Sequence, residues 1–260
     1  MNPELSYASQ PANDEPEPTP KGFFSRLTGV YFSPGETFQE IGRAPRVVVP
    51  IIATVLLTLV TVFVVFQRLP FDKITDRRLE QAVESGRITQ EQANQQREQM
   101  NKFAPVMKAV IPFAAAIFSV VLVLGIAGVM KLISSMMGIE NKFLSLFAAT
   151  LYAMLAVSVV GAVVTILLLY LKPVDDIDPT NPVGSNLAAW LSMAGVTGLP
   201  KFISALFAYV DVFYIWKVVL IAIGWAAVSR KLKTSTAMVY ATVGALLLAL
   251  IGAGWTAMFS

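Results

Sequence analysis

The sequence predicts an all-α membrane protein, a polytopic bundle of about five transmembrane helices with an N-terminal interfacial helix and a polar helical hairpin insert. Two observations carry this prediction. The chain has 260 residues, of which 55% are hydrophobic and only 14% are charged, and its mean hydropathy is +0.64. The apolar residues also gather in segments as long as the roughly 20 residues that a helix needs to cross a bilayer. A soluble globule of this composition would have more apolar surface than its core could bury.

The residue types that are missing exclude several classes of chemistry. The sequence contains no cysteine and no histidine, which removes disulfides, thiolate nucleophiles, Ser/His/Asp triads and zinc sites with Cys or His ligands. We therefore expect no enzymatic activity, no catalytic residues, no metal site and no cofactor. The net charge of +3 is modest, so nucleic-acid binding is not expected either.

Five apolar segments define the predicted spans, whose ends such patterns place only to within a few residues. The first, Val47 to Phe66, carries no charge and is bounded by Arg46 and Arg68. Its Pro50 lies in the first turn, where a missing N–H costs little. The other four segments are about Val106 to Ile133, Phe143 to Leu171, Phe207 to Val228 and Ala237 to Phe259.

The residues before the first span divide into two parts, so residues 1–21 are predicted to be a tail and residues 22–260 a single membrane domain. The tail is polar, acidic and rich in proline, which is typical of disorder. Gly22 to Ala44 is too polar to span yet carries several aromatic residues, and we expect it to lie on the membrane surface. Within it, Ser33-Pro34-Gly35-Glu36 has the form of a capping box and predicts a helix from Pro34 to about Gly42. A plain connector is the alternative.

The hydrophilic insert at 67–105 has the pattern of a helical hairpin. Asp72 or Thr75 can start one helix, which Gly86 ends, and Thr89-Gln90-Glu91-Gln92 is a second capping box that starts a helix to about Phe103. The few apolar residues suffice to join two short helices but not to form a separate domain; they are Ile74, Val83, Ile88, Ala93, Met100 and Phe103.

The connection between the third and fourth spans begins with Asp175, Asp176 and Asp178. A calcium site is an alternative interpretation of these acids, but their spacing does not match an EF-hand loop. Further along, the residues around Trp190 predict a short interfacial helix.

The distribution of Lys and Arg favours a cytoplasmic N-terminus and a C-terminus outside. The rule that basic short loops stay in the cytoplasm rests here on one set of cations, all on one side of the predicted bundle: Arg43, Arg46, Lys131, Lys142, Arg230, Lys231 and Lys233. The basic residues of the 67–105 insert fall on the opposite side and weigh against this orientation.

The fifth span carries an alanine every four residues, at Ala237, Ala241, Ala245, Ala249, Ala253 and Ala257. Small residues at this spacing let two helix backbones approach closely, and in lipid such packing holds helices together. The partner is either another helix of this chain or a second copy of it.

Asp211 and Lys217 are the ionisable residues placed deepest in a predicted span. A charge at the bilayer centre costs about 2.5 to 3.5 kcal/mol on insertion scales, so each should have a polar neighbour or reach toward the interface. One interpretation is an intramembrane polar site that binds a ligand or relays a proton. The other is hydrogen bonding between helices, and no second span offers a matching acid or base for a transport pathway.

Three stretches resemble the Yip family, the Ypt/Rab GTPase-interacting proteins with a five-span Yip-one domain, and specifically its prokaryotic branch. They are Phe32 to Phe38, Ala205 to Trp216 and Leu220 to Gly224, and the motif positions are Pro34, Phe38, Asp211, Phe213, Trp216 and Gly224. The resemblance implies a membrane-organising adaptor without catalysis. The Asp-Leu-Tyr-Gly-Pro motif of eukaryotic members is absent, so GTPase binding is not implied for this chain.

Two functions of different kinds follow from these observations. The first is a non-enzymatic scaffold that organises membrane or binds partners, which would be the lipid bilayer and other membrane proteins or a second copy. The second is a transporter or channel-like permease that uses Asp211 and Lys217 as its intramembrane polar site.

Overall fold

The computed structural model describes residues 21–69, 71–173, 177 and 181–259, and the side chains of 71–74, 77–78, 81 and 259 are not described. The predicted disordered tail therefore lies outside the described residues except for Lys21. All named elements in the described part are helices. The predicted all-α membrane bundle is confirmed.

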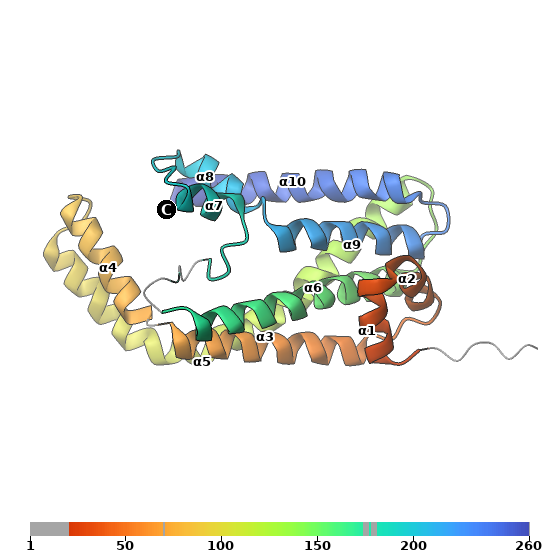
Figure 1. The fold of residues 1–260 in the computed structure, drawn as a ribbon, viewed down its shortest axis with the longest axis horizontal. Coiled ribbons are helices and arrows are strands. Elements are labelled where there is room, and N and C mark those ends of the chain that lie inside the picture. Colours follow the sequence, from red (N-terminus) through yellow and green to blue (C-terminus); the bar gives the residue numbers. More distant parts are fainter. Residues whose placement is uncertain (1–20, 70, 174–176, 178–180, 260) are drawn as a thin grey trace, which may run out of the picture.

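Four long helices frame the molecule, and each is long and apolar enough to cross a membrane by its length and composition. They are α3 (Val48–Arg68), α5 (Gln90–Met136), α6 (Phe143–Leu171) and α10 (Thr234–Phe259). Together with α9 (Val212–Val228) they run along the long axis of the molecule (Figure 1). The helices α1 (Phe23–Phe32) and α2 (Pro34–Arg43) lie at one end of the bundle, and the C-terminus lies at the other.

The core surrounds the first half of α6. Every residue of α6 from Ser145 to Val157 is buried, whereas Val163 and Leu167, further along the same helix, are exposed. The core also takes buried residues from α1, α2, α5, α9 and α10. The packing is therefore concentrated at the end of the bundle that carries α1 and α2.

The predicted fourth span is corrected by the structure, because it is two helices and not one. The shorter α8 (Lys201–Ala208) ends before Tyr209, and the 17-residue α9 begins only at Val212. The Asp211 carboxylate accepts the N–H of Tyr214 at 2.9 Å and so caps α9. At this position the Asp211 carboxylate takes the place of the backbone carbonyl that would accept an N–H in a continuous helix. The helix is therefore interrupted before Val212.

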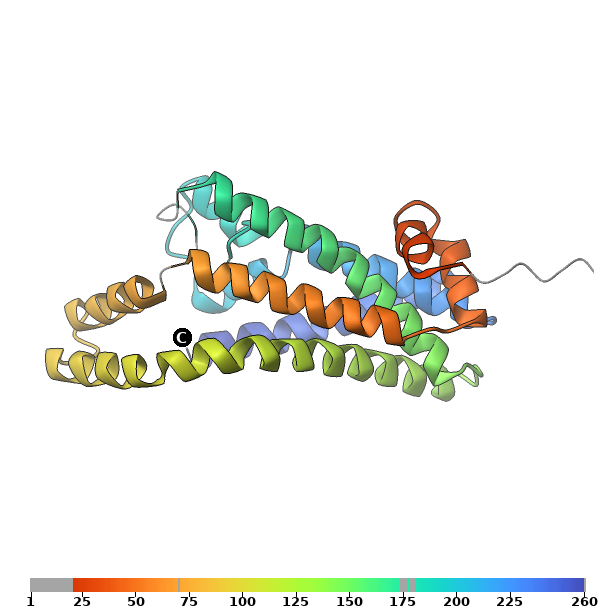
Figure 2. The same cartoon turned by 90° about the horizontal axis from the view of Figure 1, so that it is seen from below.

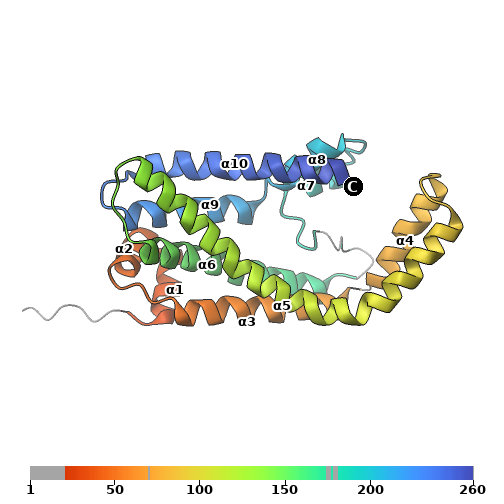
Figure 3. The ribbon, with the colours of Figure 1, turned by 180° about the vertical axis from the view of Figure 1, so that it is seen from behind.

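The second span is also longer than predicted. We expected a hairpin helix to end near Phe103 and a span to begin near Val106, but α5 continues through Pro105 and Pro112. Each proline leaves one carbonyl, four residues earlier, without its helical partner, and those residues, Asn101 and Lys108, are exposed. Water or a headgroup can therefore replace the missing bond, and α5 bends where it leaves the bundle (Figure 3).

The predicted polar hairpin consists of α4 (Phe71–Glu84) and the start of α5, which project together beyond the bundle (Figure 2). Both hydrogen bonds of the Thr89–Gln92 capping box are present. Arg97 of α5 forms ion pairs with Asp76 at 3.0 Å and Glu80 at 3.2 Å on α4. Leu79 and Ala93 are buried here, but Met100 and Phe103, which we expected to join the helices, are exposed.

Candidate functional site

The helices α1 and α2 form a tight hairpin that lies across the end of the bundle, roughly perpendicular to α3 (Figure 1). We call residues 23–43 the N-terminal hairpin. The two helices cross at Gly29, where a Cβ would clash with the Oγ1 of Thr37. Ser33 lies between the helices, and although α2 begins at Pro34 as predicted, the side chain of Ser33 makes no capping hydrogen bond.

The N-terminal hairpin is more than a surface helix, because one of its faces is part of the core. Val30, Phe38 and Ile41 are completely buried, and they belong to the same cluster as the first half of α6 and α9. On the other face, Phe24 and Phe32 are 78% and 85% exposed. The hairpin therefore has a fixed inner face and a free, partly aromatic outer face.

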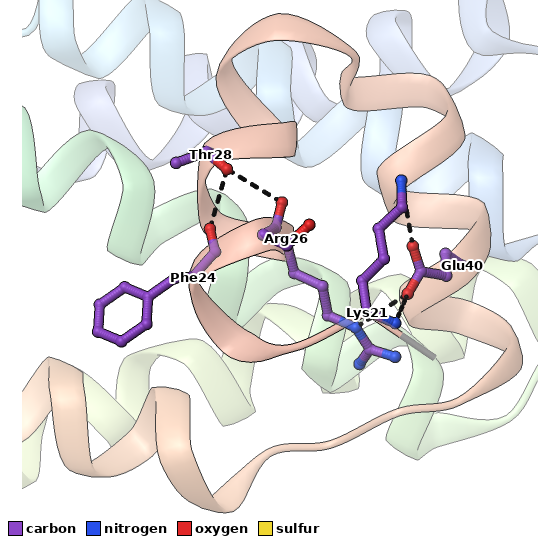
Figure 4. Close-up of polar contacts among 6 residues, drawn as sticks. Lys21, Phe24, Arg26, Thr28 and Glu40 are labelled. Atoms are coloured by element: carbon purple, nitrogen blue, oxygen red, sulfur yellow. Dashed lines mark hydrogen bonds and ion pairs between the residues drawn. The ribbon is translucent and has the colours of Figure 1, made fainter. Parts of the chain in front are cut away.

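A buried arginine holds the two helices of the hairpin together. The side chain of Arg26 is only 1% exposed, and its Nε lies 3.3 Å from Oε1 of Glu40. Its Nη1 donates to the carbonyl of Ala44 at 2.8 Å. Glu40 also accepts the backbone N–H of Lys21 at 2.8 Å, so one carboxylate joins the start of α1 to the end of α2 (Figure 4). Burying a charge is costly unless it is paired in this way.

Phe38 of α2 fills a space created by Gly224 of α9. A Cβ built on Gly224 would lie 3.4 Å from the Phe38 ring and 3.4 Å from the Cβ of Ala149 on α6. Only a very small side chain fits between the three helices. Nearby, a Cβ on Gly42 of α2 would lie 2.9 Å from Cγ1 of Val228, so glycines at two points bring α2 against α9.

Tyr31 fixes the depth of α1 in the bundle. Its hydroxyl donates to the backbone carbonyl of Ala156 on α6 at 2.7 Å, and its ring lies 6.0 Å from the ring of Trp216 on α9. Burial raises the pKa of the Tyr31 phenol, so at neutral pH the group remains a hydrogen-bond donor. Phe213 packs against the same core cluster.

Both carboxylate oxygens of Asp211 accept hydrogen bonds from nearby residues. Besides capping α9, its carboxylate accepts the hydroxyl of Ser185. The chain around Ser185 forms an isolated bridge with this segment, in which the N–H of Leu187 donates to the Val210 carbonyl at 2.9 Å. Asp211 thus ties the long connection after α6 to the start of α9.

Lys217 is not bonded directly to Asp211. It lies on α9, where it is partly exposed. Among the described residues, no hydrogen bond or ion pair links it to Asp211 or to another acid, although the charge of Asp211 is near enough to act on it. A shared intramembrane polar site for the two residues stays a prediction.

A family model for the Yip1 domain matches residues 28–256. The chain belongs to the Yip1 domain family. The resemblance expected from the sequence is confirmed at this level, and the prokaryotic branch stays a prediction. No curated protein and no solved structure matches the chain.

Two motif positions of this Yip1 domain meet in space although they lie almost 190 residues apart in sequence, because Phe38 packs against Gly224. Pro34 starts the helix that carries Phe38. Trp216 contacts the hairpin through Tyr31, and Asp211 starts the helix that carries Phe213, Trp216 and Gly224. The motif stretches therefore contribute to the contact between the N-terminal hairpin and α9.

The alanine ridge of the Yip1 domain's last helix faces its own chain. Ala237, Ala249 and Ala253 are buried, and α10 packs against α9 and α8. Tyr214 of α9 donates its hydroxyl to the Ala245 carbonyl at 3.0 Å. A Cβ on Gly252 would lie 2.8 Å from Cζ of Tyr209, so the small residues make room for two tyrosines at the α8–α9 break.

Sequence reasoning missed Arg26, Glu40 and Tyr31. A usable signal existed for the first pair, since an arginine inside an otherwise uncharged ten-residue helix needs a partner, and Glu40 is the acid at the far end of the next helix. Within the described residues, no group of three His, Cys, Asp or Glu side chains could hold a metal ion. The alternative calcium site falls on Asp175, Asp176 and Asp178, which lie outside the described residues.

Proposed function

We propose that this multi-pass membrane protein is a non-enzymatic scaffold of a bacterial cytoplasmic membrane, which organises lipid and partners through its N-terminal hairpin. The observation that carries this proposal is the two-faced hairpin. Its inner face is held against α6 and α9 by Phe38 and Tyr31, its two helices are joined by the buried Arg26, and its outer face presents Phe24 and Phe32.

The outer face is suited to the interfacial layer of a bilayer. Phe24, Thr28 and Phe32 are spaced by four residues and so lie along one side of α1, and all three are exposed. The Thr28 hydroxyl donates to the Phe24 carbonyl at 2.9 Å, which satisfies a polar group on this otherwise apolar stripe. Helices with an apolar stripe of this kind lie in the plane of the interface and respond to curvature.

Because the hairpin lies at one end of the bundle (Figure 1), its exposed rings enter one leaflet. With the N-terminus in the cytoplasm, as the basic loops predict, that leaflet is the inner one. Apolar side chains inserted into one leaflet favour a curved membrane around the protein. The described residues also bring together no nucleophile, base and oxyanion donors of the kind that a catalytic site requires.

Reconstitution into vesicles tests the proposal. At a fixed protein-to-lipid ratio, the wild-type chain should shift the vesicle diameter measured by electron cryomicroscopy, and Phe24→Ala/Phe32→Ala should return it to that of protein-free vesicles. Burial of the two side chains in lipid contributes about 3 kcal/mol or more to the free energy of inserting the hairpin. The matched control is Phe113→Ala/Phe118→Ala, which removes two exposed rings from the span of α5.

Equal vesicle diameters with wild-type chain and Phe24→Ala/Phe32→Ala would contradict the membrane-shaping role. If the same variant instead lost proteins that co-purify with the wild type, the hairpin would be a partner-binding surface. The permease alternative is supported less well, because the Asp211 carboxylate is already engaged by Tyr214 and Ser185. A solute flux abolished by Asp211→Asn/Lys217→Met would favour the permease.

A further inference from the structure

A basic hollow lies at the end of the bundle that carries the N-terminal hairpin. Its volume is about 1160 Å³, and it is lined by the end of α2, the end of α5, the α5–α6 turn with the start of α6, and the α9–α10 turn with the end of α9. Figure 3 shows these segments gathered at one end of the molecule. Of the cations that line this hollow, only Arg43 belongs to the N-terminal hairpin.

The charges around the hollow have one sign almost without exception. Five cations line it, Arg43, Lys131, Lys142, Arg230 and Lys231, against a single acid, Glu140. Among the described residues none of the five forms an ion pair with an acid. They come from four separate segments of the chain, so the fold, and not a local run of sequence, brings them together. Like charges around a shared hollow repel one another, and a bound anion would relieve that repulsion.

The walls of the hollow are held in place by polar contacts between distant segments. The Ser145 hydroxyl of α6 donates to the Gly42 carbonyl of α2 at 2.9 Å. The Asn141 amide donates to the Ser229 hydroxyl at 2.9 Å, which joins the α5–α6 and α9–α10 turns. The Lys131 ammonium donates to the Asn141 carbonyl at 2.8 Å, so its position is also fixed. A site built in this way needs little rearrangement when a ligand binds.

Asn141, which lines the hollow, also carries an acceptor without a donor. The Oδ1 atom of Asn141 is buried and has no hydrogen-bond partner among the described residues. A buried acceptor left alone is costly. A ligand that carries a hydroxyl beside its negative group would satisfy this atom while its charge is held by the cations.

We propose that the hollow is a binding site for a phosphate ester, carried either by an anionic lipid headgroup or by a small soluble molecule. The hollow lies near the end of the apolar helix α5, which carries Lys131, and beside the end of α2, which carries Arg43. Headgroup phosphates gather at this level, and basic pockets between helices are suited to them. Arginine and lysine are the side chains that bind phosphate most strongly.

Native mass spectrometry of the detergent-solubilised full chain tests the proposal. Dioleoyl phosphatidylglycerol carries the phosphate charge and hydroxyls, and dioleoyl phosphatidylcholine has the same chains without net charge. We expect phosphatidylglycerol to bind at least tenfold more tightly. Lys142→Gln/Arg230→Gln should weaken its binding roughly thirtyfold, since each cation near an anionic headgroup contributes roughly fivefold. Both side chains are exposed, so the fold should be retained.

Three comparisons make the result decisive. Arg87→Gln/Lys102→Gln removes two exposed cations from the polar hairpin at the other end and should change affinity less than twofold. Arg43→Gln, on a different helix of the hollow, should weaken binding roughly fivefold on its own. Glycerol 3-phosphate distinguishes the sources, because binding as tight as that of phosphatidylglycerol identifies a soluble ligand and much weaker binding identifies a lipid.

The proposal is overturned if phosphatidylglycerol binds no better than phosphatidylcholine and glycerol 3-phosphate does not bind. It is also overturned if the control pair at the polar hairpin weakens binding as much as Lys142→Gln/Arg230→Gln does. That result would mean that net charge alone attracts the lipid.

Discussion

At the scale of single residues, the buried Arg26 matters most to the N-terminal hairpin. Its guanidinium reaches Glu40 and the Ala44 carbonyl from inside the core, and one more of its nitrogens, Nη2, is buried without a hydrogen-bond partner in the described part of the chain. A cation that is only 1% exposed depends on its one carboxylate. The hairpin should therefore respond sharply to loss of that partner.

Replacing Glu40 with alanine should lower the free energy of unfolding by about 3 kcal/mol, because it leaves a buried charge without its counter-ion. The value lies at the lower end of the usual range, since the Glu40 side chain is 24% exposed. Thermal unfolding in detergent measures the loss. Glu36→Ala, an exposed acid on the same helix, should have little effect.

The double variant Arg26→Met/Glu40→Ala separates charge from packing. It removes the buried cation together with its partner, so it should be more stable than Glu40→Ala alone. If the double variant were the less stable of the two, Arg26 would be stabilising the hairpin through its packing, and the unpaired charge would not be the cause of the loss in Glu40→Ala.

At the scale of elements, the break between α8 and α9 is matched to the small residues of α10. Tyr209 and Tyr214 lie 5.8 Å apart, ring to ring, and both face α10. Gly252 leaves room for Tyr209, whereas Gly254, two residues later, has nothing within 4 Å of the place where a Cβ would be. The two glycines therefore provide a matched comparison on one helix.

Gly252→Ala should destabilise the protein, because the new methyl group would overlap the Tyr209 ring and push α8 away from α10. Gly254→Ala should be neutral or slightly stabilising, since alanine is the better helix former and the space is open. Thermal unfolding in detergent compares the two variants. A similar effect of both would show that the α8–α10 contact does not depend on this close approach.

At the scale of the whole molecule, the directions of α3, α5, α6, α9 and α10 place the N-terminal hairpin and the end of α10 at opposite ends (Figure 1). The polar hairpin lies at the same end as the C-terminus, and the α9–α10 turn lies at the end of the N-terminal hairpin. Crossing the membrane in five passes, with the N-terminus inside, stays a prediction of this arrangement.

The absence of cysteine makes that topology simple to test. Ser85→Cys, on the polar hairpin, and Lys233→Cys, before α10, both replace exposed residues. An impermeant thiol reagent added to intact cells should label Ser85→Cys and not Lys233→Cys, and both should react once the membrane is permeabilised. Labelling of both variants in intact cells would exclude the five-pass arrangement.

Several elements could be predicted because their signals are local. The Thr89–Gln92 capping box, the start of α2 at Pro34 and the long apolar helices all depend on residues within one or two helical turns. The α8–α9 break also has a local signal, because Asp211 is a residue type that favours helix N-caps. Apolar residues lie on both sides of it, however, and hydropathy alone therefore predicted one continuous span.

The candidate site depends on contacts that no local pattern encodes. Phe38 and Gly224 were recognised as motif positions, yet only packing shows that one fills the space left by the other. Lys142 and Arg230 were counted as cations on one side, yet their shared hollow depends on how the ends of α2, α5 and α9 meet.

By itself, the sequence determined that this protein is an α-helical membrane bundle of the Yip1 family, because apolar length and motif residues are properties of single segments. Only the tertiary structure decided that the N-terminal hairpin is built into the core, that Asp211 caps a helix instead of lying inside one, and that five cations share one hollow. Those features depend on contacts between residues far apart in the chain, such as Phe38 with Gly224 and Asp211 with Ser185, and the geometry of such contacts exists only once the helices are packed.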